Sequence, residues 1–200
     1  MQTRTIQPSA SILIESMRDI GYTLDAAIAD LIDNSIAAGS STIDVFAEPV
    51  GESYSIGILD NGIGMSEDQL FEAMRLGSRN PREVRSQKDL GRFGLGLKTA
   101  SFSQCRRLTV LTRQNGKTAS AIWDLDEIAI RDSWDVLVPE TSETVLWSDR
   151  LGDSGTLVVW EKLDRVLDAS SANLSGLFAS RLSSCSDHLQ LTFHRFLAGE

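Results

Sequence analysis

The chain has 200 residues, of which 42% are hydrophobic and 24% charged, a balance that suits one sizeable globular domain with a real core. Its formal charge of −9 at pH 7 argues against a surface that binds nucleic acid or an anionic membrane as a whole. Cys105 and Cys185 lack the spacing of a metal knuckle, and no apolar run approaches the length of a membrane span. We therefore expect one domain over residues 1–200, located in the cytoplasm, with no membrane contact.

Two amphipathic helices are predicted at the start of the chain. Apolar residues recur at helical spacing over residues 9–21 and again over 23–38. Thr23 is the expected N-cap of the second helix, and Gly39 is its expected terminator.

Asp30 and Asn34 lie four residues apart on the second predicted helix and therefore share one face. A carboxylate and an amide in this arrangement can orient a water molecule and ligate a hard cation. The same pair is also typical of a polar surface stripe, so the other segments have to decide between the two interpretations.

Two strands are predicted near residues 43–45 and 54–58, joined by a turn over 48–52. The second strand runs into the segment Asp60-Asn61-Gly62-Ile63-Gly64-Met65, in which a carboxylate is followed by two glycines. Glycines at such a strand end allow a tight turn and let a flat ligand approach the backbone. Residues 66–69 fit a capping box, so we expect a further helix to begin there.

A polar stretch without apolar periodicity follows over residues 77–91 and predicts a long loop, of a length that often serves as a lid. It leads into Gly91-Arg92-Phe93-Gly94-Leu95-Gly96-Leu97-Lys98, where a helix is expected to begin near Leu95. Free N–H groups at a helix start and the charge of Lys98 suit a phosphate. Seven of the 19 Lys and Arg residues lie between residues 75 and 98, which favours an anionic ligand. The spacing matches neither a Walker A loop nor a dinucleotide-binding turn.

The rest of the chain predicts more strands and a terminal helix. A hairpin is expected through residues 114–117, weaker strands near 128–130 and 136–138, and a buried strand over 155–161, whereas 141–154 has no clear pattern. Apolar residues over 166–197 recur at three- and four-residue steps, which predicts an amphipathic helix after a core of residues 8–165. His188 and His194 lie in this region without a third ligand, so we interpret them as surface residues.

Four segments together resemble the motifs of the GHKL superfamily, which includes gyrase B, heat-shock chaperones, histidine kinases and MutL. They are Asp30–Asn34, Asp60–Met65, Gly91–Lys98 and Gly155–Thr156, and they agree in content, order and spacing. The first motif is most similar to those of MutL and MORC proteins. The resemblance implies a Bergerat ATP-binding fold: an α/β (α+β) two-layer sandwich with a mixed β-sheet, helices on one face, and a nucleotide lid.

The resemblance also implies a role for particular residues. Asn34 would ligate Mg²⁺, Asp60 would accept a hydrogen bond from the adenine amino group, Thr156 would contact adenine, and Lys98 would contact phosphate. The full set implied to bind ATP is Asn34, Asp60, Gly62, Gly64, Met65, Gly91, Phe93, Gly94, Leu95, Gly96, Leu97, Lys98 and Thr156.

Asp30 stands where the family usually has a glutamate as general base. Its side chain is one methylene shorter, and a misplacement of about 1 Å can cost on the order of a hundredfold in rate. The sequence therefore predicts ATP binding more firmly than hydrolysis.

The leading hypothesis is an Mg²⁺-dependent ATP-binding domain that hydrolyses ATP slowly, with a lid over residues 77–96 that orders on the bound phosphates. The resemblance implies coupling to homodimer closure and to an effector region, so we expect the chain to be the N-terminal part of a longer protein. Nucleic acid would be contacted only through a partner or a further domain.

Two alternatives stay open. One is a non-hydrolysing nucleotide switch or interaction module, in which Asp30 is too short to activate water. The other is a histidine-kinase-type catalytic domain, although we find no phosphotransfer helices ahead of the first predicted helix.

Overall fold

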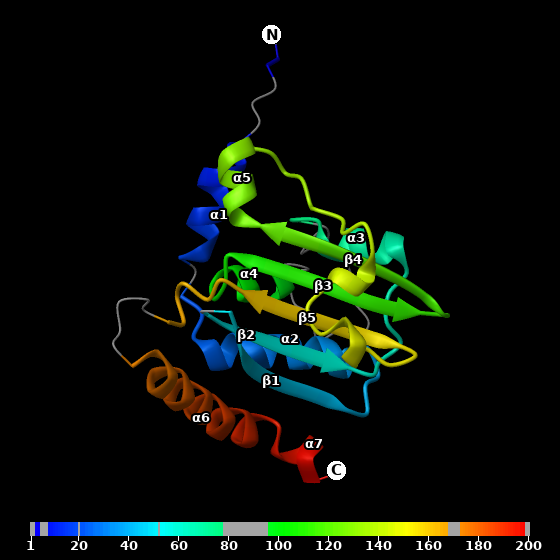
Figure 1. Cartoon of the computed structure of the whole chain (residues 1–200), viewed down its shortest axis with the longest axis vertical. Helices are drawn as coiled ribbons and strands as arrows, with labels where there is room; N and C mark the ends of the chain where they lie inside the picture. Colours follow the sequence, from blue (N-terminus) through cyan, green and yellow to red (C-terminus); the bar gives the residue numbers. More distant parts are fainter. Residues whose placement is uncertain are drawn as a thin grey trace.

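The computed structural model describes residues 3–4, 8–19, 21–51, 53–77, 96–167 and 173–198. The strands are β1 (Ile43–Val50), β2 (Ser53–Asp60), β3 (Arg107–Gln114), β4 (Lys117–Asp124) and β5 (Gly155–Glu161). They form a five-stranded sheet in the order β1-β2-β5-β3-β4 (Figure 1). The predicted hairpin through residues 114–117 and the buried strand over 155–161 are confirmed.

Two hairpins and one inserted strand build the sheet. β1 pairs with β2 and β3 with β4, while β5 lies between β2 and β3 and runs antiparallel to both. Tight turns reverse the chain in each hairpin; at the second, Asn115 and Gly116 take φ of 51° and 73°, as a type I′ turn requires. The two-layer α/β class is confirmed, but the ladders among the described residues are all antiparallel, so the expected mixed sheet is corrected.

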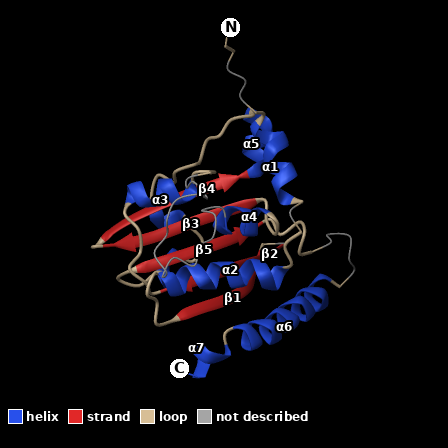
Figure 2. Ribbon diagram, turned by 180° about the vertical axis from the view of Figure 1, so that it is seen from behind, coloured by secondary structure: helices blue, strands red, loops and turns tan. Residues whose placement is uncertain are grey.

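The helices are α1 (Ala10–Arg18), α2 (Leu24–Ala37), α3 (Glu67–Met74), α4 (Gly96–Phe102), α5 (Leu125–Arg131), α6 (Leu174–Thr192) and α7 (His194–Ala198). Figure 2 shows α2, α3 and α4 on one face of the sheet, with α1 beside α5 at one end and α6 beside α2 at the other. None of the helices in the described ranges is long and apolar enough to cross a membrane.

Several helix boundaries follow local signals in the sequence. Thr23 caps α2 by accepting a hydrogen bond from the Ala26 N–H, and Gly39 takes φ 74° after its end. Ser66 and Gln69 form the predicted capping box of α3. These expectations are confirmed.

Other predicted boundaries are wrong. Residues 125–131 form α5 rather than a strand, because the Asp124 side chain accepts from the Asp126 N–H and caps a helix directly after β4. Near 136–138 there is a single bridge between Leu137 and Ile122. The terminal helix begins at Leu174 instead of residue 166, with Asn173 as its N-cap, and is interrupted at Phe193. β1 continues to Val50, so the turn predicted over 48–52 is shorter.

The main core lies between the sheet and the helices. Its helix side includes Ile28, Leu31, Leu70 and Phe102, and its sheet side includes the rows Ile58-Val158-Val110 and Ile56-Trp160-Leu108. The opposite face of the sheet is covered by the segment 133–153, where Val145 and Leu151 pack on Leu111, Leu157 and Val159 in a smaller cluster (Figure 1). The helix-covered face therefore has the depth to hold a ligand.

Candidate functional site

A row of polar side chains crosses the helix-covered face of the sheet. The strand register pairs Asp60 with Thr156, and Thr156 with Thr112, so the three lie side by side on β2, β5 and β3. The next row along these strands is apolar and consists of Ile58, Val158 and Val110. The result is a flat apolar floor with hydrogen-bonding groups along one edge.

A cavity of about 440 Å³ lies over this floor, within the usual size range of small-ligand sites. Its wall includes Asn34 and Ser35 from α2, Gly64 and Met65 from the loop after β2, and Gly96, Leu97 and Lys98 from α4. Residues from all four sequence motifs therefore meet around one cavity. The expected site residues Gly91, Phe93, Gly94 and Leu95, and most of the expected lid, lie outside the described residues.

Asp60 ends β2 and is buried at the polar edge of the cavity. Its Oδ1 accepts hydrogen bonds from the Gly62 N–H at 2.8 Å and from Ser40 Oγ at 3.2 Å. Its Oδ2 lies 3.1 Å from Ser35 Oγ. The single proton of Ser35 is shared with the Leu31 carbonyl oxygen, 3.2 Å from its Oγ. Because a carboxylate has about four acceptor positions, these contacts orient Asp60 and leave at least one position for a ligand.

The hydroxyl of Thr112 determines the orientation of Thr156. Thr112 donates to the Gly155 carbonyl oxygen at 2.9 Å and accepts from the Met65 N–H at 2.9 Å. Since its only proton is used, the 3.2 Å contact between the two hydroxyls has Thr156 as the donor. The lone pairs of Thr156 remain free to accept, so Asp60 and Thr156 present two neighbouring acceptors to the cavity.

Gly64 brings the loop after β2 against the sheet. Its φ is +66°, and a Cβ there would lie 2.1 Å from the carbonyl oxygen of Arg113. Gln114 Nε2 donates to the Gly64 carbonyl at 3.1 Å and holds this approach from β3. A side chain at this position would push the loop away from the cavity.

The polar face of α2 approaches the cavity at the start of α4. Asn34 is exposed and lines the cavity, and its side-chain amide makes no hydrogen bond to the described part of the chain. Asp30 lies one turn earlier, and a Cβ on Gly96 would be 3.7 Å from its Oδ2. The hydroxyl of Tyr22 donates to the same Asp30 oxygen at 2.9 Å.

Asp33 adds a second carboxylate to this part of α2. It is partly buried, and this burial, together with the negative charge of Asp30, raises the pKa of Asp33 above its ordinary value. Two carboxylates close enough to interact in this way favour a cation in their neighbourhood.

Lys98 is buried beside the cavity, and its ammonium group is engaged at the end of α3. Nζ donates to the carbonyl oxygens of Ala73 at 2.7 Å and Arg75 at 2.8 Å. A cation at the C-terminal end of a helix is favoured by the helix dipole. The predicted phosphate contact of Lys98 stays a prediction.

With this geometry established, comparison with known proteins decides the family. Over residues 22–156 the chain matches the family described as Histidine kinase-, DNA gyrase B-, and HSP90-like ATPase. The chain belongs to this family. It is an ATP-binding domain of the GHKL type, and the matched span contains both acceptors and the residues that line the cavity, except Val158 of the floor.

Individual relatives of the GHKL domain come from three groups. ATPase MORC2B of Mus musculus is 31% identical over 94 residues, covering 46% of this chain and 9% of the relative. Chaperone protein HtpG of Rickettsia rickettsii is 32% identical over 114 residues, covering 50% and 18%. DNA mismatch repair protein MutL of Paramagnetospirillum magneticum is 33% identical over 104 residues, covering 50% and 16%. The match spans less than a fifth of each of these relatives.

Several described residues of the GHKL site lie outside the sequence predictions, Gln114 beside Gly64 among them. Thr112, Ser35, Ser40 and Tyr22 all form hydrogen bonds to predicted site residues. Ser35 directly follows Asn34, so its place after a motif residue was a usable signal. Thr112, Ser40 and Tyr22 come close to the predicted site residues only in the folded chain, so no motif in the sequence marks them.

Proposed function

We propose that this GHKL domain binds ATP with Mg²⁺ in the cavity over β2, β5 and β3 and hydrolyses it slowly. The observation that carries the proposal is the pair of acceptors, Asp60 and Thr156, beside a flat apolar floor. The exocyclic amino group of adenine donates to such acceptors, and the faces of its ring are apolar. Guanine has a carbonyl oxygen at the corresponding position, which would face two acceptors, so the arrangement favours adenine.

The residues around Asn34 fit a magnesium ion carried by a nucleotide. Within the described ranges, no three His, Cys, Asp or Glu side chains gather as a metal cage. Mg²⁺ in nucleotide sites is held by one or two protein oxygens together with phosphates and water, so a cage is unnecessary. The Asn34 amide oxygen would supply one such ligand. When bound, the ion would neutralise charge on the phosphates.

Asp30 is the group that we assign as general base. Its carboxylate lies beside the start of α4, one helical turn from Asn34. In this role it orients the attacking water and accepts its proton, which requires hydrogen-bond distance to that water. Because aspartate is shorter than the usual glutamate, we expect a low rate.

Phosphate release by the wild type and by Asp30→Asn tests the hydrolysis proposal. The substitution keeps the shape of the side chain but removes the base, so release should fall at least about a hundredfold. The dissociation constant for ATP should change less than about threefold. Asp44→Asn, an exposed substitution on β1, is the matched control.

One structural observation favours a second candidate, the non-hydrolysing nucleotide switch. One oxygen of Asp30 is already engaged by Tyr22, and the side chain is short. Equal, background-level phosphate release by the wild type and Asp30→Asn, with ATP still bound, would establish the switch and contradict the ATPase.

We also propose that the domain acts within a longer protein and dimerises when ATP binds. The support is the small share of MORC2B, HtpG and MutL that it covers, together with the family resemblance. Nucleic acid would then be contacted through another domain or partner. Light scattering with and without a non-hydrolysable ATP analogue measures the dimerisation, and an unchanged mass would contradict it.

A further inference from the structure

Tyr22 connects the segment before α2 with the carboxylate of Asp30. Its hydroxyl donates to Asp30 Oδ2 at 2.9 Å. The Thr99 side chain, on α4, forms a hydrogen bond to the same phenol that lowers the phenol's pKa, as a donor does. The phenol thus receives a hydrogen bond from α4 and directs its own proton at the carboxylate on α2.

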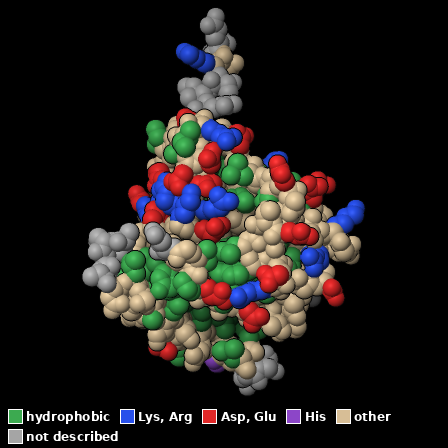
Figure 3. All heavy atoms as spheres, in the orientation of Figure 1, with side chains coloured by type: hydrophobic (Ala, Val, Ile, Leu, Met, Phe, Trp, Pro, Cys, Tyr) green, Lys and Arg blue, Asp and Glu red, His purple; other side chains and the backbone are tan. Residues whose placement is uncertain are grey.

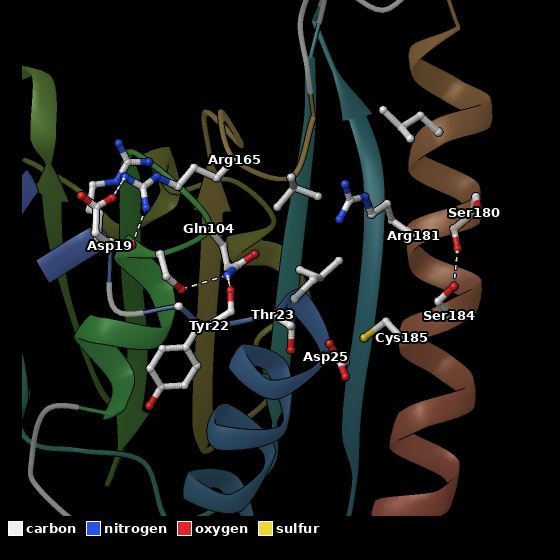
Figure 4. Close-up of a pocket in the computed structure, with 16 residues that line it drawn as sticks. Asp19, Tyr22, Thr23, Asp25, Gln104, Arg165, Ser180, Arg181, Ser184 and Cys185 are labelled. Carbon is white, nitrogen blue, oxygen red and sulfur yellow. Dashed lines mark hydrogen bonds and ion pairs between the residues drawn. The ribbon is translucent and has the colours of Figure 1, made fainter.

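The backbone at Tyr22 is fixed independently of its hydroxyl. Gln104 Nε2 donates to the Tyr22 carbonyl oxygen at 3.1 Å and to Ser103 Oγ at 2.8 Å. Figure 4 shows these bonds and shows that the Tyr22 phenol oxygen points away from Gln104. Tyr22 also lines a second cavity of about 730 Å³, together with Thr23 and residues of α6. Removing the hydroxyl therefore leaves the main anchor of this segment in place.

Tyr22 remains a proton donor near neutral pH. Burial is the largest cause that raises its pKa above 10.0, and the hydrogen bond and the charge of Asp30 add to it. The hydrogen bond to Asp30 is therefore not lost by ionisation of the phenol near neutral pH.

We propose that Tyr22 is a positioning residue that holds the Asp30 carboxylate beside the start of α4, where the hydrolysis reaction needs it. The proposal rests on the assignment of Asp30 as general base. A short aspartate reaches fewer positions than a glutamate, so its usefulness depends on a fixed rotamer and a fixed backbone. The Tyr22 hydroxyl donates to one oxygen of Asp30 and leaves the other oxygen free to accept a hydrogen bond from water. A base held in this way compensates in part for the missing methylene.

The test compares Tyr22→Phe with the wild type in ATP affinity and in kcat. The substitution removes one oxygen and keeps the ring, so the dissociation constant for ATP should change less than about twofold while kcat falls about tenfold to a hundredfold. Tyr54→Phe is the matched control, because it removes the same oxygen from a tyrosine away from Asp30. Tyr54 lies on β2, and the centroid of its ring is 4.3 Å from that of Phe178. The control should leave both values unchanged.

A second background separates positioning from a general loss of structure. In Asp30→Glu the longer side chain no longer depends on the same hydrogen bond, so adding Tyr22→Phe there should lower kcat less than about threefold. An equal loss in both backgrounds would identify a merely structural role and overturn the proposal.

The outcomes also separate this proposal from the proposed function. If the wild type hydrolyses ATP, Asp30→Asn does not, and Tyr22→Phe matches the wild type, the positioning role is wrong while the ATPase stands. If the wild type releases no more phosphate than Asp30→Asn, the base assignment fails and the role of Tyr22 fails with it.

Discussion

At Gly64 the backbone comes so close to β3 that no side chain fits. In Gly64→Ala we expect a clash with the Arg113 carbonyl oxygen. In addition, a non-glycine residue at this positive φ is destabilised by roughly 1–3 kcal/mol. We predict at least a tenfold loss in ATP affinity and a lower free energy of unfolding, measured by calorimetry and by urea denaturation.

Gly116→Ala is the control for this substitution. Gly116 has nearly the same backbone angle, φ +73°, but a Cβ there would meet no atom within 4 Å. It should therefore show only the conformational cost, with unchanged ATP affinity. Equal effects of the two substitutions would contradict the close approach at Gly64.

At the scale of single residues, the sequence predicts a site residue best where a reactive side chain stands within a short recognisable motif. The structure brings Asp60, Gly64, Asn34 and Thr156 around one cavity. Thr112 and Tyr22 could not be found in this way, because Thr112 reaches Met65 and Thr156 only through strand pairing, and Tyr22 reaches Asp30 only after α2 has formed. The Thr112 contacts depend on the register of the sheet, and the Tyr22 contact depends on how the segment before α2 folds back on that helix.

At the scale of elements, a network of ion pairs ties the end of the sheet to α1 and α5. Figure 3 shows basic and acidic side chains intermingled over this region. Asp124, at the end of β4, is buried and lies 2.8 Å from Arg107 Nη1 and 3.1 Å from Lys162 Nζ. Burial alone would raise the pKa of Asp124, but the hydrogen bonds from Lys162, the Asp126 N–H and Arg107 outweigh it and lower the pKa below 3.8.

This shift predicts a pH dependence of stability. A carboxyl group whose pKa is lowered by folding stabilises the protein above its unfolded pKa, and this contribution is lost as the pH falls through the folded value. Asp124→Asn should therefore lower the free energy of unfolding by about 1–3 kcal/mol at pH 7. The difference from the wild type should shrink below about pH 4.

Urea denaturation at several pH values measures this difference, with Asp44→Asn as the control. Asp44 is exposed and forms no ion pair with the rest of the described chain. A difference between wild type and Asp124→Asn that is independent of pH would contradict the ionic role.

Elements are predictable where their own residues carry the signal. The caps of α2 and α3 and the Asn115-Gly116 turn are local, and they are confirmed. The alternation of Ile128 and Ile130 is typical of a strand, yet α5 forms there because Asp124 caps it and Ile128 packs into the core. The tertiary environment overrides a two-residue pattern.

At the scale of the whole molecule, the order of four motifs indicates the family, although none is specific alone, and the match over residues 22–156 establishes it. The motifs lie far apart in sequence and meet because β5 inserts between two hairpins, which puts Thr156 beside Asp60. The antiparallel sheet could not be derived from the resemblance, because motif spacing does not fix strand direction. The match covers 9% of MORC2B and 18% of HtpG, so coupling of this domain to further domains stays a proposal.

Titration of the domain with Mg·ATP by calorimetry tests whether adenine binds at Asp60. We predict saturable binding at one site per chain for the wild type and for Asp44→Asn. Asp60→Asn should bind at least about tenfold more weakly, since a hydrogen bond to a charged acceptor is worth about 1.5–3 kcal/mol. Absence of binding by the wild type, or equal affinity of the wild type and a folded Asp60→Asn, would show that adenine does not bind at Asp60.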